Sequence, residues 1–181
     1  MYISKLHLHP NSTKDVYTAH QRIWKAFGNP RDKGSDRPFL FYQADDRTVV
    51  VISAEMPRDE AVVYMRKLEN EFCAGKKYHF RACVNPTRRD GATGKIKALG
   101  TEEEMTEWLR RKMAPAGKIL NSFILKRTMK VGRKKQISFS AVEIEGILEC
   151  TDPDELWKIY TGGIGREKGF GCGTVLLKTA G

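Results

Sequence analysis

Several features that identify common protein classes are missing from this sequence of 181 residues. It has no run of about 18 apolar residues, the length that a membrane-spanning helix requires, so we expect no membrane span. Its N-terminus has no apolar segment of the signal-peptide kind, so we expect no secretory leader. A Gly-Lys-Ser/Thr phosphate-binding motif is also absent, which argues against a bound mononucleotide.

Cysteine is scarce, and its spacing indicates no metal. The chain has four cysteines, and none of them forms a Cys-x-x-Cys pair. That spacing is typical of zinc sites and redox-active dithiols, so neither is predicted. We expect reduced thiols in a cytoplasmic protein, and we predict no bound metal and no cofactor. The cysteines are Cys73, Cys83, Cys150 and Cys172.

Positive charge is abundant. The chain has 32 Lys and Arg residues against 22 Asp and Glu, a formal net charge of +10. A balance of this kind predicts an anionic partner, with nucleic acid favoured over a membrane surface. Hydrophobic residues make up 40% of the chain, which is enough for a folded core.

Glycine gathers near the C-terminal end of the chain. Six of the residues from Gly162 to Gly173 are glycine, and Arg166 and Lys168 lie among them. A nucleotide-binding glycine motif follows a strand and opens a helix, whereas here a helix-like segment comes first and a strand-like one follows. A loop lying along a polynucleotide backbone fits better. The alternative is a tight connection without a ligand.

Hydrophobic periodicity predicts the order β-α-β-β-α-β for the first half of the chain. Ser12-x-x-Asp15 resembles a capping box at the start of the first helix. Pro57 would open the second helix, with an apolar stripe at Ala61, Met65, Leu68 and Phe72. The predicted segments are a strand (2–8), a helix (12–27), two strands (37–44 and 47–54), the helix from Pro57 and a strand (78–84).

The second half repeats the pattern. Thr101-x-x-Glu104 is a capping box for a third helix, and Asp152-Pro153 starts a fourth. A strand (95–99), a long hairpin (118–129 and 136–150) and a final strand after the glycines complete the order. This repetition predicts an α+β protein of two tandem ferredoxin-like, RRM-like βαββαβ domains. Their predicted ranges are 1–87 and 95–181, joined by a basic linker (88–94).

The tip of the long hairpin is strongly basic, with six cations and no acid within ten positions. The apolar phase slips by one residue along the return strand, from Ile137 and Phe139 to Val142 and Ile144, which predicts a bulge there. A bent basic ribbon has a shape that enters a nucleic-acid groove. The alternative is a solvated, charge-protected sheet edge. The six cations are Lys126, Arg127, Lys130, Arg133, Lys134 and Lys135.

Four groups of residues together resemble the CasE family, the CRISPR repeat-processing endoribonucleases of type I-E systems. The resemblance extends over almost the whole chain. The groups are Tyr17-x-x-His20 with Arg37-Pro38-Phe39-Leu40; Phe80-x-x-x-x-Asn85-Pro86-Thr87; Trp108-Leu109-x-x-Lys112 with Gly117; and Gly146-x-Leu148 with Gly163-Ile164-Gly165-Arg166-x-Lys168-x-Phe170-Gly171-Cys172-Gly173.

The resemblance implies a substrate, partners and catalytic residues. The substrate would be the repeat hairpin of a CRISPR transcript, cut without metal at the 3′ base of its stem. The guide RNA would stay bound with the other subunits of a type I-E surveillance complex. The family's catalytic histidine and tyrosine would fall on His20 and Tyr17. The predicted RNA-binding residues are Arg88, Arg89, Lys126, Arg127, Lys130, Arg133, Lys134, Lys135, Gly163, Gly165, Arg166 and Lys168.

The chemistry that the resemblance implies is attack by the RNA 2′-OH, which leaves a 2′,3′-cyclic phosphate and a 5′-OH. Histidine suits proton transfer near neutral pH, and whether His20 would act as acid or base stays open. Taken from its helix alone, His20 would be a packed core histidine, because a lone histidine on an apolar stripe is usually structural. The alternative functions are a non-catalytic RRM-like RNA-binding protein and a structural subunit. The sequence lacks the aromatic RNP1 pattern of RNA-binding RRM strands.

Overall fold

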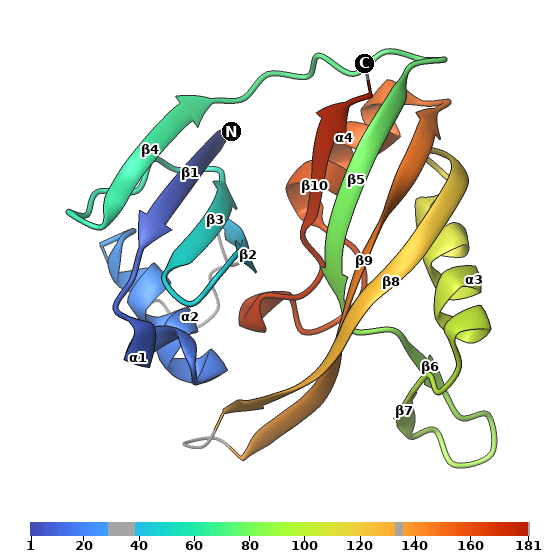
Figure 1. Ribbon diagram of the computed structural model, residues 1–181, viewed down its shortest axis with the longest axis horizontal. Coiled ribbons are helices and arrows are strands. Elements are labelled where there is room, and N and C mark those ends of the chain that lie inside the picture. The colour runs from blue at the N-terminus through green and yellow to red at the C-terminus, as the bar shows by residue number, and fades with distance from the viewer. Residues whose placement is uncertain (29–38, 133–135, 181) are drawn as a thin grey trace.

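The computed structural model describes residues 1–28, 39–132 and 136–180. Two four-stranded antiparallel sheets form the body of the molecule, and a two-stranded sheet projects from the second (Figure 1). The predicted α+β class with two tandem ferredoxin-like domains is confirmed in its strand order, which is the same in both sheets. Within the described ranges, no helix is long and apolar enough to cross a membrane.

The first sheet has the order β2-β3-β1-β4. Helix α2 (Val16–Lys25) covers one of its faces, where Ile23 packs with residues such as Leu6, Phe39 and Val51 in one apolar cluster. The strands are β1 (Tyr2–His7), β2 (Phe39–Gln43), β3 (Thr48–Ser53) and β4 (Val62–Lys67).

The helix predicted from Pro57 is wrong, because strand β4 occupies this part of the chain. It pairs antiparallel with β1 and so satisfies the free backbone groups of that edge. Val62, Val63 and Tyr64 are β-branched or aromatic residues that favour a strand. The stripe from Ala61 to Phe72 has helical spacing, but Met65 within it is exposed. A turn-rich connection therefore joins β3 to β4 where the ferredoxin-like pattern has its second helix.

The start of the first helix also differs from the prediction. A one-turn helix α1 (Pro10–Thr13) comes first, with His9 as its N-cap. Asp15, and not Ser12, is the N-cap of α2, because its carboxylate accepts a hydrogen bond from the Thr18 amide at 2.9 Å. Proline at a first helical position favours an early start, and this separates the short helix from the long one.

The second sheet has the order β10-β5-β9-β8. Its core includes Phe80 and Leu148 from the sheet, with Leu109 and Leu156 from two helices. Both predicted helices are confirmed, and α3 has the capping box of Thr101. The elements are β5 (Lys77–Val84), α3 (Glu102–Met113), β8 (Gly117–Gly132), β9 (Ile137–Cys150), α4 (Pro153–Gly162) and β10 (Val175–Thr179).

The prediction that the strand at 78–84 completes the first half is wrong. Strand β5 pairs with β9 and β10 of the second sheet, and its alternating pattern alone could not indicate which sheet it joins. The predicted linker (88–94) is part of a hairpin of β6 (Thr87–Arg89) and β7 (Ile96–Ala98), so the strand expected at 95–99 pairs outside the main sheet. We propose a domain boundary that follows the sheets, at 68–76.

The two sheets pack on each other through buried residues of both. Tyr42 and Val50 of the first sheet lie in one buried cluster with Cys83 of the second sheet and with Cys172 of the loop that precedes β10. The Tyr42 hydroxyl lies 3.1 Å from a Glu143 carboxylate oxygen. Burial, together with this carboxylate, raises the pKa of Tyr42 to about 12, so the phenol stays protonated and can donate to Glu143.

The long hairpin of β8 and β9 continues beyond the ends of β5 and β10 (Figure 1). Its register shifts between Ile119 and Asn121 and between Ile124 and Lys126. The bulges therefore lie on the outgoing strand, and not on the return strand as predicted. The change in the apolar alternation along β9 has another cause, namely that the strand packs on both of its faces. Ala141 packs against the first domain, while Val142 and Ile144 belong to the core of the second.

Candidate active site

His20 projects from the edge of the buried stripe of α2 and is half-buried. Its ring lies among three aromatic rings, with centroids 6.1 Å from Trp24, 6.2 Å from Phe39 and 5.6 Å from Phe170. Phe170 comes from the glycine-rich loop of the second domain. The histidine therefore lies at the junction of the two domains and not in the core of the first.

Two hydrogen bonds fix the His20 imidazole. Nδ1 lies 2.7 Å from the carbonyl oxygen of Gly169, a residue 149 positions away in the sequence. The Trp24 indole N–H donates to Nε2 at 2.9 Å. A carbonyl can only accept and an indole N–H can only donate, so the ring is neutral with its hydrogen on Nδ1.

Tyr17 precedes His20 by one helical turn and is also half-buried. The Gln21 amide nitrogen lies 3.3 Å from the Tyr17 hydroxyl. The far end of the long hairpin reaches this point, since a Cβ added at Gly132 would lie 3.2 Å from Val16 Cγ2 and 3.5 Å from Tyr17 Cβ. Three predicted features, the Tyr17-x-x-His20 pair, the glycine loop and the basic hairpin, thus meet around one helix.

Internal packing accounts for much of the glycine in the loop. Gly165 and Gly171 have φ of +75° and +84°, a region that glycine enters without the steric cost of a side chain. An added Cβ would lie 2.9 Å from the Trp108 ring at Gly165 and 2.8 Å from the Phe41 ring at Gly171. The glycines let the loop lie close against both domains, which holds the Gly169 carbonyl at His20.

The two cations of the loop have different surroundings. Lys168 Nζ donates to the carbonyl oxygens of Gly162 and Gly163 at 2.7 and 2.9 Å. It therefore binds the C-terminal end of α4, where cations are favourable. Arg166 is exposed. Of the two, Arg166 is the one whose exposure suits contact with a phosphate.

A groove of about 510 Å³ runs beside the loop. It brings together Arg89 of the projecting hairpin, Arg166 of the loop and Lys112 of α3. Lys112 was missing from the predicted site, although its spacing from Trp108 places the two on one helix face. No Asp or Glu is among the described residues of its wall, which are Thr87, Arg89, Ile96, Trp108, Lys112, Gly163, Ile164, Gly165, Arg166 and Lys168.

The other predicted RNA-binding residues are more scattered. Arg88 forms an exposed ion pair with Glu104 at 3.1 Å. Arg127 donates to the carbonyl oxygens of Leu99 and Gly100, so it ties the hairpin to the segment before α3. Lys126 is exposed, and Lys130 lies 3.4 Å from the Gln43 amide oxygen. The positions outside the described residues are Arg133, Lys134 and Lys135.

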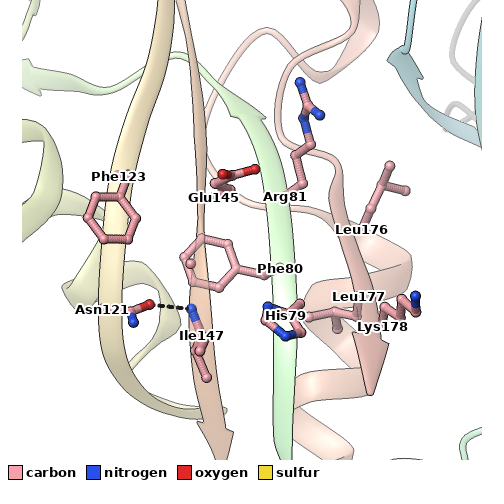
Figure 2. A pocket seen from close by; sticks show the side chains of 11 residues that line it. His79, Phe80, Arg81, Asn121, Phe123, Glu145, Ile147, Leu176, Leu177 and Lys178 are labelled. Carbon is pink, nitrogen blue, oxygen red and sulfur yellow. Dashed lines mark hydrogen bonds between the residues drawn. The ribbon is translucent and has the colours of Figure 1, made fainter. Parts of the chain in front are cut away.

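A second hollow of about 440 Å³ crosses β8, β9, β5 and β10 on the second sheet (Figure 2). His79, Arg81 and Glu145 line it together with Phe123, whose surface is 62% exposed. His20 and Tyr17 do not belong to its walls. It is therefore separate from the junction at α2, and its histidine provides a natural control for His20.

The described cysteines are all free thiols, three buried and one exposed. Cys83 and Cys172 lie with their sulfur atoms 3.9 Å apart beneath the glycine loop. The hydrogen bond with Cys172 lowers the pKa of the Cys83 thiol, and the same contact, with burial, raises that of Cys172. These residues pack the loop against β5.

A family model described as "CRISPR associated protein" matches residues 1–179. The chain belongs to this family. The CRISPR system Cascade subunit CasE of Escherichia coli is 29% identical to this CRISPR-associated protein, over 98% of each chain. The CRISPR-associated endoribonuclease Cse3 of Thermus thermophilus is 28% identical, over 96% of this chain and 97% of the relative. The resemblance to the CasE family predicted from the sequence is confirmed.

Solved structures agree with these relatives. The structure of CRISPR endoribonuclease Cse3 bound to a 19 nt RNA superposes with a TM-score of 0.87 at 26% identity, covering 98% of this chain and 97% of the other. The overall arrangement of the two domains is therefore shared with an RNA-bound endoribonuclease of the family.

Proposed function

We propose that this protein is a metal-independent endoribonuclease that binds the stem-loop of CRISPR repeat RNA and cleaves it at the 3′ base of the stem. Relatives over nearly the full chain are named as endoribonuclease and Cascade subunit. The observation that carries the assignment of the site is the meeting of His20 with the glycine loop at the domain junction. A proton-transferring side chain lies there within a strongly basic protein.

The reaction uses a nucleophile that the RNA itself supplies. The ribose 2′-OH loses its proton as its oxygen attacks the neighbouring phosphorus, and the bond from phosphorus to the 5′ oxygen breaks. The 5′ oxygen takes up a proton, leaving a 2′,3′-cyclic phosphate and a 5′-OH. His20 transfers one of these protons, and Tyr17 positions the reacting groups by hydrogen bonding.

The basic groove offers the RNA backbone a surface beside the loop that contacts His20. Arg89, Lys112 and Arg166 are exposed along it, and Arg166 belongs to the same loop as Gly169, whose carbonyl oxygen meets His20. The long hairpin, whose far end reaches Tyr17 at Gly132, adds Lys126 and Lys130. An RNA duplex is read mainly through its shape and backbone, so these cations are expected to bind phosphates.

The cleaved RNA is proposed to stay with the protein in a type I-E surveillance complex in the cytoplasm. The Escherichia coli relative is named as a subunit of Cascade, which supports membership of such an assembly. The four free thiols suit a reducing compartment.

The deciding experiment is cleavage of a cognate repeat hairpin by purified protein in EDTA. His20→Ala is expected to lower the single-turnover rate by about 10²- to 10⁴-fold, the usual contribution of one acid–base group. Hairpin affinity should stay within about twofold, because phosphate contacts supply most of the binding. Wild-type protein should cleave equally fast in EDTA and in magnesium.

His79→Ala is the matched control, since His79 lies in the separate hollow on the second sheet (Figure 2). It should cleave at the wild-type rate. Full-rate cleavage by His20→Ala would remove His20 from the mechanism. Binding without cleavage by wild-type protein would instead favour a non-catalytic RNA-binding role.

A further inference from the structure

The Nε2 nitrogen of His20 is engaged by a neighbour on the same helix. Nδ1 carries the ring hydrogen because it faces the Gly169 carbonyl oxygen at 2.7 Å. The only lone pair of the neutral ring is therefore on Nε2, and the Trp24 indole N–H donates to it at 2.9 Å. Helical spacing of four residues brings these two side chains together.

The proposed chemistry needs the same nitrogen. While Nδ1 stays on the Gly169 carbonyl, Nε2 is the atom that takes a proton from the ribose 2′-OH or, once protonated, gives one to the 5′ oxygen. As a base, Nε2 requires a free lone pair. As an acid, it carries a hydrogen, and an indole N–H cannot donate to a protonated nitrogen. Either role is incompatible with the Trp24–His20 hydrogen bond.

We propose that Trp24 is a positioning residue whose indole N–H occupies the lone pair of His20 Nε2 in the RNA-free protein and releases it when substrate RNA binds. The inference rests on the proposed function and adds a step to it. The ribose 2′-OH is itself a donor, so it can replace the indole N–H at Nε2 without leaving the lone pair unpaired. Only RNA seated with that hydroxyl at His20 makes the exchange, which couples correct docking to the availability of the base.

The indole ring has a second attachment that does not use its N–H. Its centroid lies 5.2 Å from that of Phe39, edge to face at 72°. Trp24→Phe should therefore keep most of the packing while removing the donor. Trp157→Phe is the matched control, because Trp157 is a half-buried helical tryptophan that packs on Phe72 and Tyr160, away from His20.

Single-turnover cleavage of the Trp24→Phe variant over a range of RNA concentrations distinguishes two roles of Trp24. In one its indole N–H occupies His20 Nε2, and in the other its ring only packs against its neighbours. Without the indole donor, RNA no longer has to break a hydrogen bond, so the half-saturating RNA concentration should fall by about two- to tenfold, the range expected for one hydrogen bond. The maximal rate should stay within about twofold. In the His20→Ala background, the same change should leave hairpin affinity unaltered. A lower maximal rate with unchanged half-saturation would mean that Trp24 only packs.

A spectroscopic test needs no variant and so covers the case in which Trp24→Phe fails to fold. The probe is the repeat hairpin with a 2′-amino group at the cleavage site, which is a donor but a poor nucleophile. The matched probe has 2′-deoxyribose there. The 2′-amino RNA should shift the Trp24 indole N–H resonance strongly, and the 2′-deoxy RNA should shift it much less.

Equal, small shifts with both RNAs would overturn the role of Trp24. That result would leave the proposed function intact if wild-type protein cleaves the hairpin and His20→Ala does not. Failure of wild-type protein to cleave would instead count against the proposed function itself. The two failures are thus distinguishable in one set of measurements.

Discussion

The two sheets share one strand order but differ in the helices that pack against them. The second has two long helices, α3 and α4, packed into a large core. Among its described residues, the first has only α2 as a long helix over its face, and a turn-rich connection stands where its second helix is expected. This connection is held by polar contacts: the Arg58 amide donates to the Ala26 carbonyl at 2.7 Å, and Arg22 bonds Asp59.

The same contrast applies to function. The first domain supplies His20 and Tyr17, whereas the second supplies the loop that holds His20 and the cations of the groove. Neither domain contains a complete site. The less regular domain thus carries the proposed proton-transfer group, and the more regular one positions it. Each prediction below alters one contact on which this division depends, beginning with the largest expected effect.

The first contact is that of Gly171 with the first sheet. Gly171→Ala would place a Cβ 2.8 Å from the Phe41 ring at a φ of +84°. We expect a loss of about 1–3 kcal/mol in the free energy of unfolding. Cleavage should fall by about tenfold or more, because the displaced loop carries the Gly169 carbonyl away from His20.

Gly162→Ala is the control for this substitution. Gly162 ends α4, and an added Cβ meets nothing within 4 Å. Thermal melting and single-turnover cleavage of both variants give the comparison. If Gly171→Ala cleaves as fast as Gly162→Ala, the placement of the loop does not limit catalysis.

The second contact is the Arg22–Asp59 ion pair, which joins α2 to the connection after β3. The two terminal nitrogens of Arg22 donate to the two carboxylate oxygens of Asp59 at 2.8 and 2.9 Å. The Arg22 side chain is only 26% exposed and that of Asp59 only 10%. The hydrogen bonds from Arg22 lower the pKa of Asp59. Asp59→Asn should cost about 1–3 kcal/mol near neutral pH.

The pH dependence of this loss has a defined sign. A lowered pKa in the folded state means that the stabilisation is complete above about pH 4, the ordinary value for aspartate. It is lost as the pH falls through the folded-state value, so wild type and Asp59→Asn should converge in acid. Urea unfolding between neutral and acidic pH measures this. Glu69→Gln, from an exposed pair with Lys67, should change stability little at any pH.

Much of the fold was predictable from local patterns. The capping box of Thr101, the proline start of α4 and the long hairpin each lie within a short segment, and all were confirmed. The prediction failed where a segment's partner decides its structure. Val62–Lys67 is a strand because β1 offers a free edge, and β5 belongs to the second sheet because β9 and β10 flank it.

The candidate site was likewise predictable only where its residues lie close together in the sequence. The one-turn spacing of Tyr17 and His20 indicates only that they lie near one helix face, and their catalytic role came from the family resemblance and stays a proposal. The contact between His20 and Gly169 joins residues 149 positions apart, which no periodicity reports. Lys168 donates to the last carbonyls of α4, a contact that was not expected, and its binding to RNA stays a prediction. A lysine after a helix is a signal for such capping.

The smallest predicted effect concerns the hairpin, which belongs to the second domain but ends against the first. Replacing Lys126 and Lys130 by alanine should weaken hairpin RNA binding and flatten the log–log salt dependence by about 0.7 to 0.9 per lost phosphate contact. The melting temperature should fall only slightly, because Lys126 is exposed and surface charges contribute only about 0 to 1 kcal/mol per pair. The half-buried Lys130 has one long contact, of 3.4 Å, with the Gln43 amide oxygen. Affinity across a salt series, with melting as the folding control, measures both effects.

Arg127→Ala provides the contrast within the same hairpin. Its guanidinium donates to the Leu99 and Gly100 carbonyl oxygens at 3.1 and 3.0 Å, so its loss should lower stability by about 1 kcal/mol. Because those bonds already occupy its nitrogens, it should change the salt dependence less than the lysine pair does. If the lysine pair left both affinity and salt slope unaltered, the hairpin would be a solvated edge, and the RNA path would run along the groove of Arg89, Lys112 and Arg166 alone.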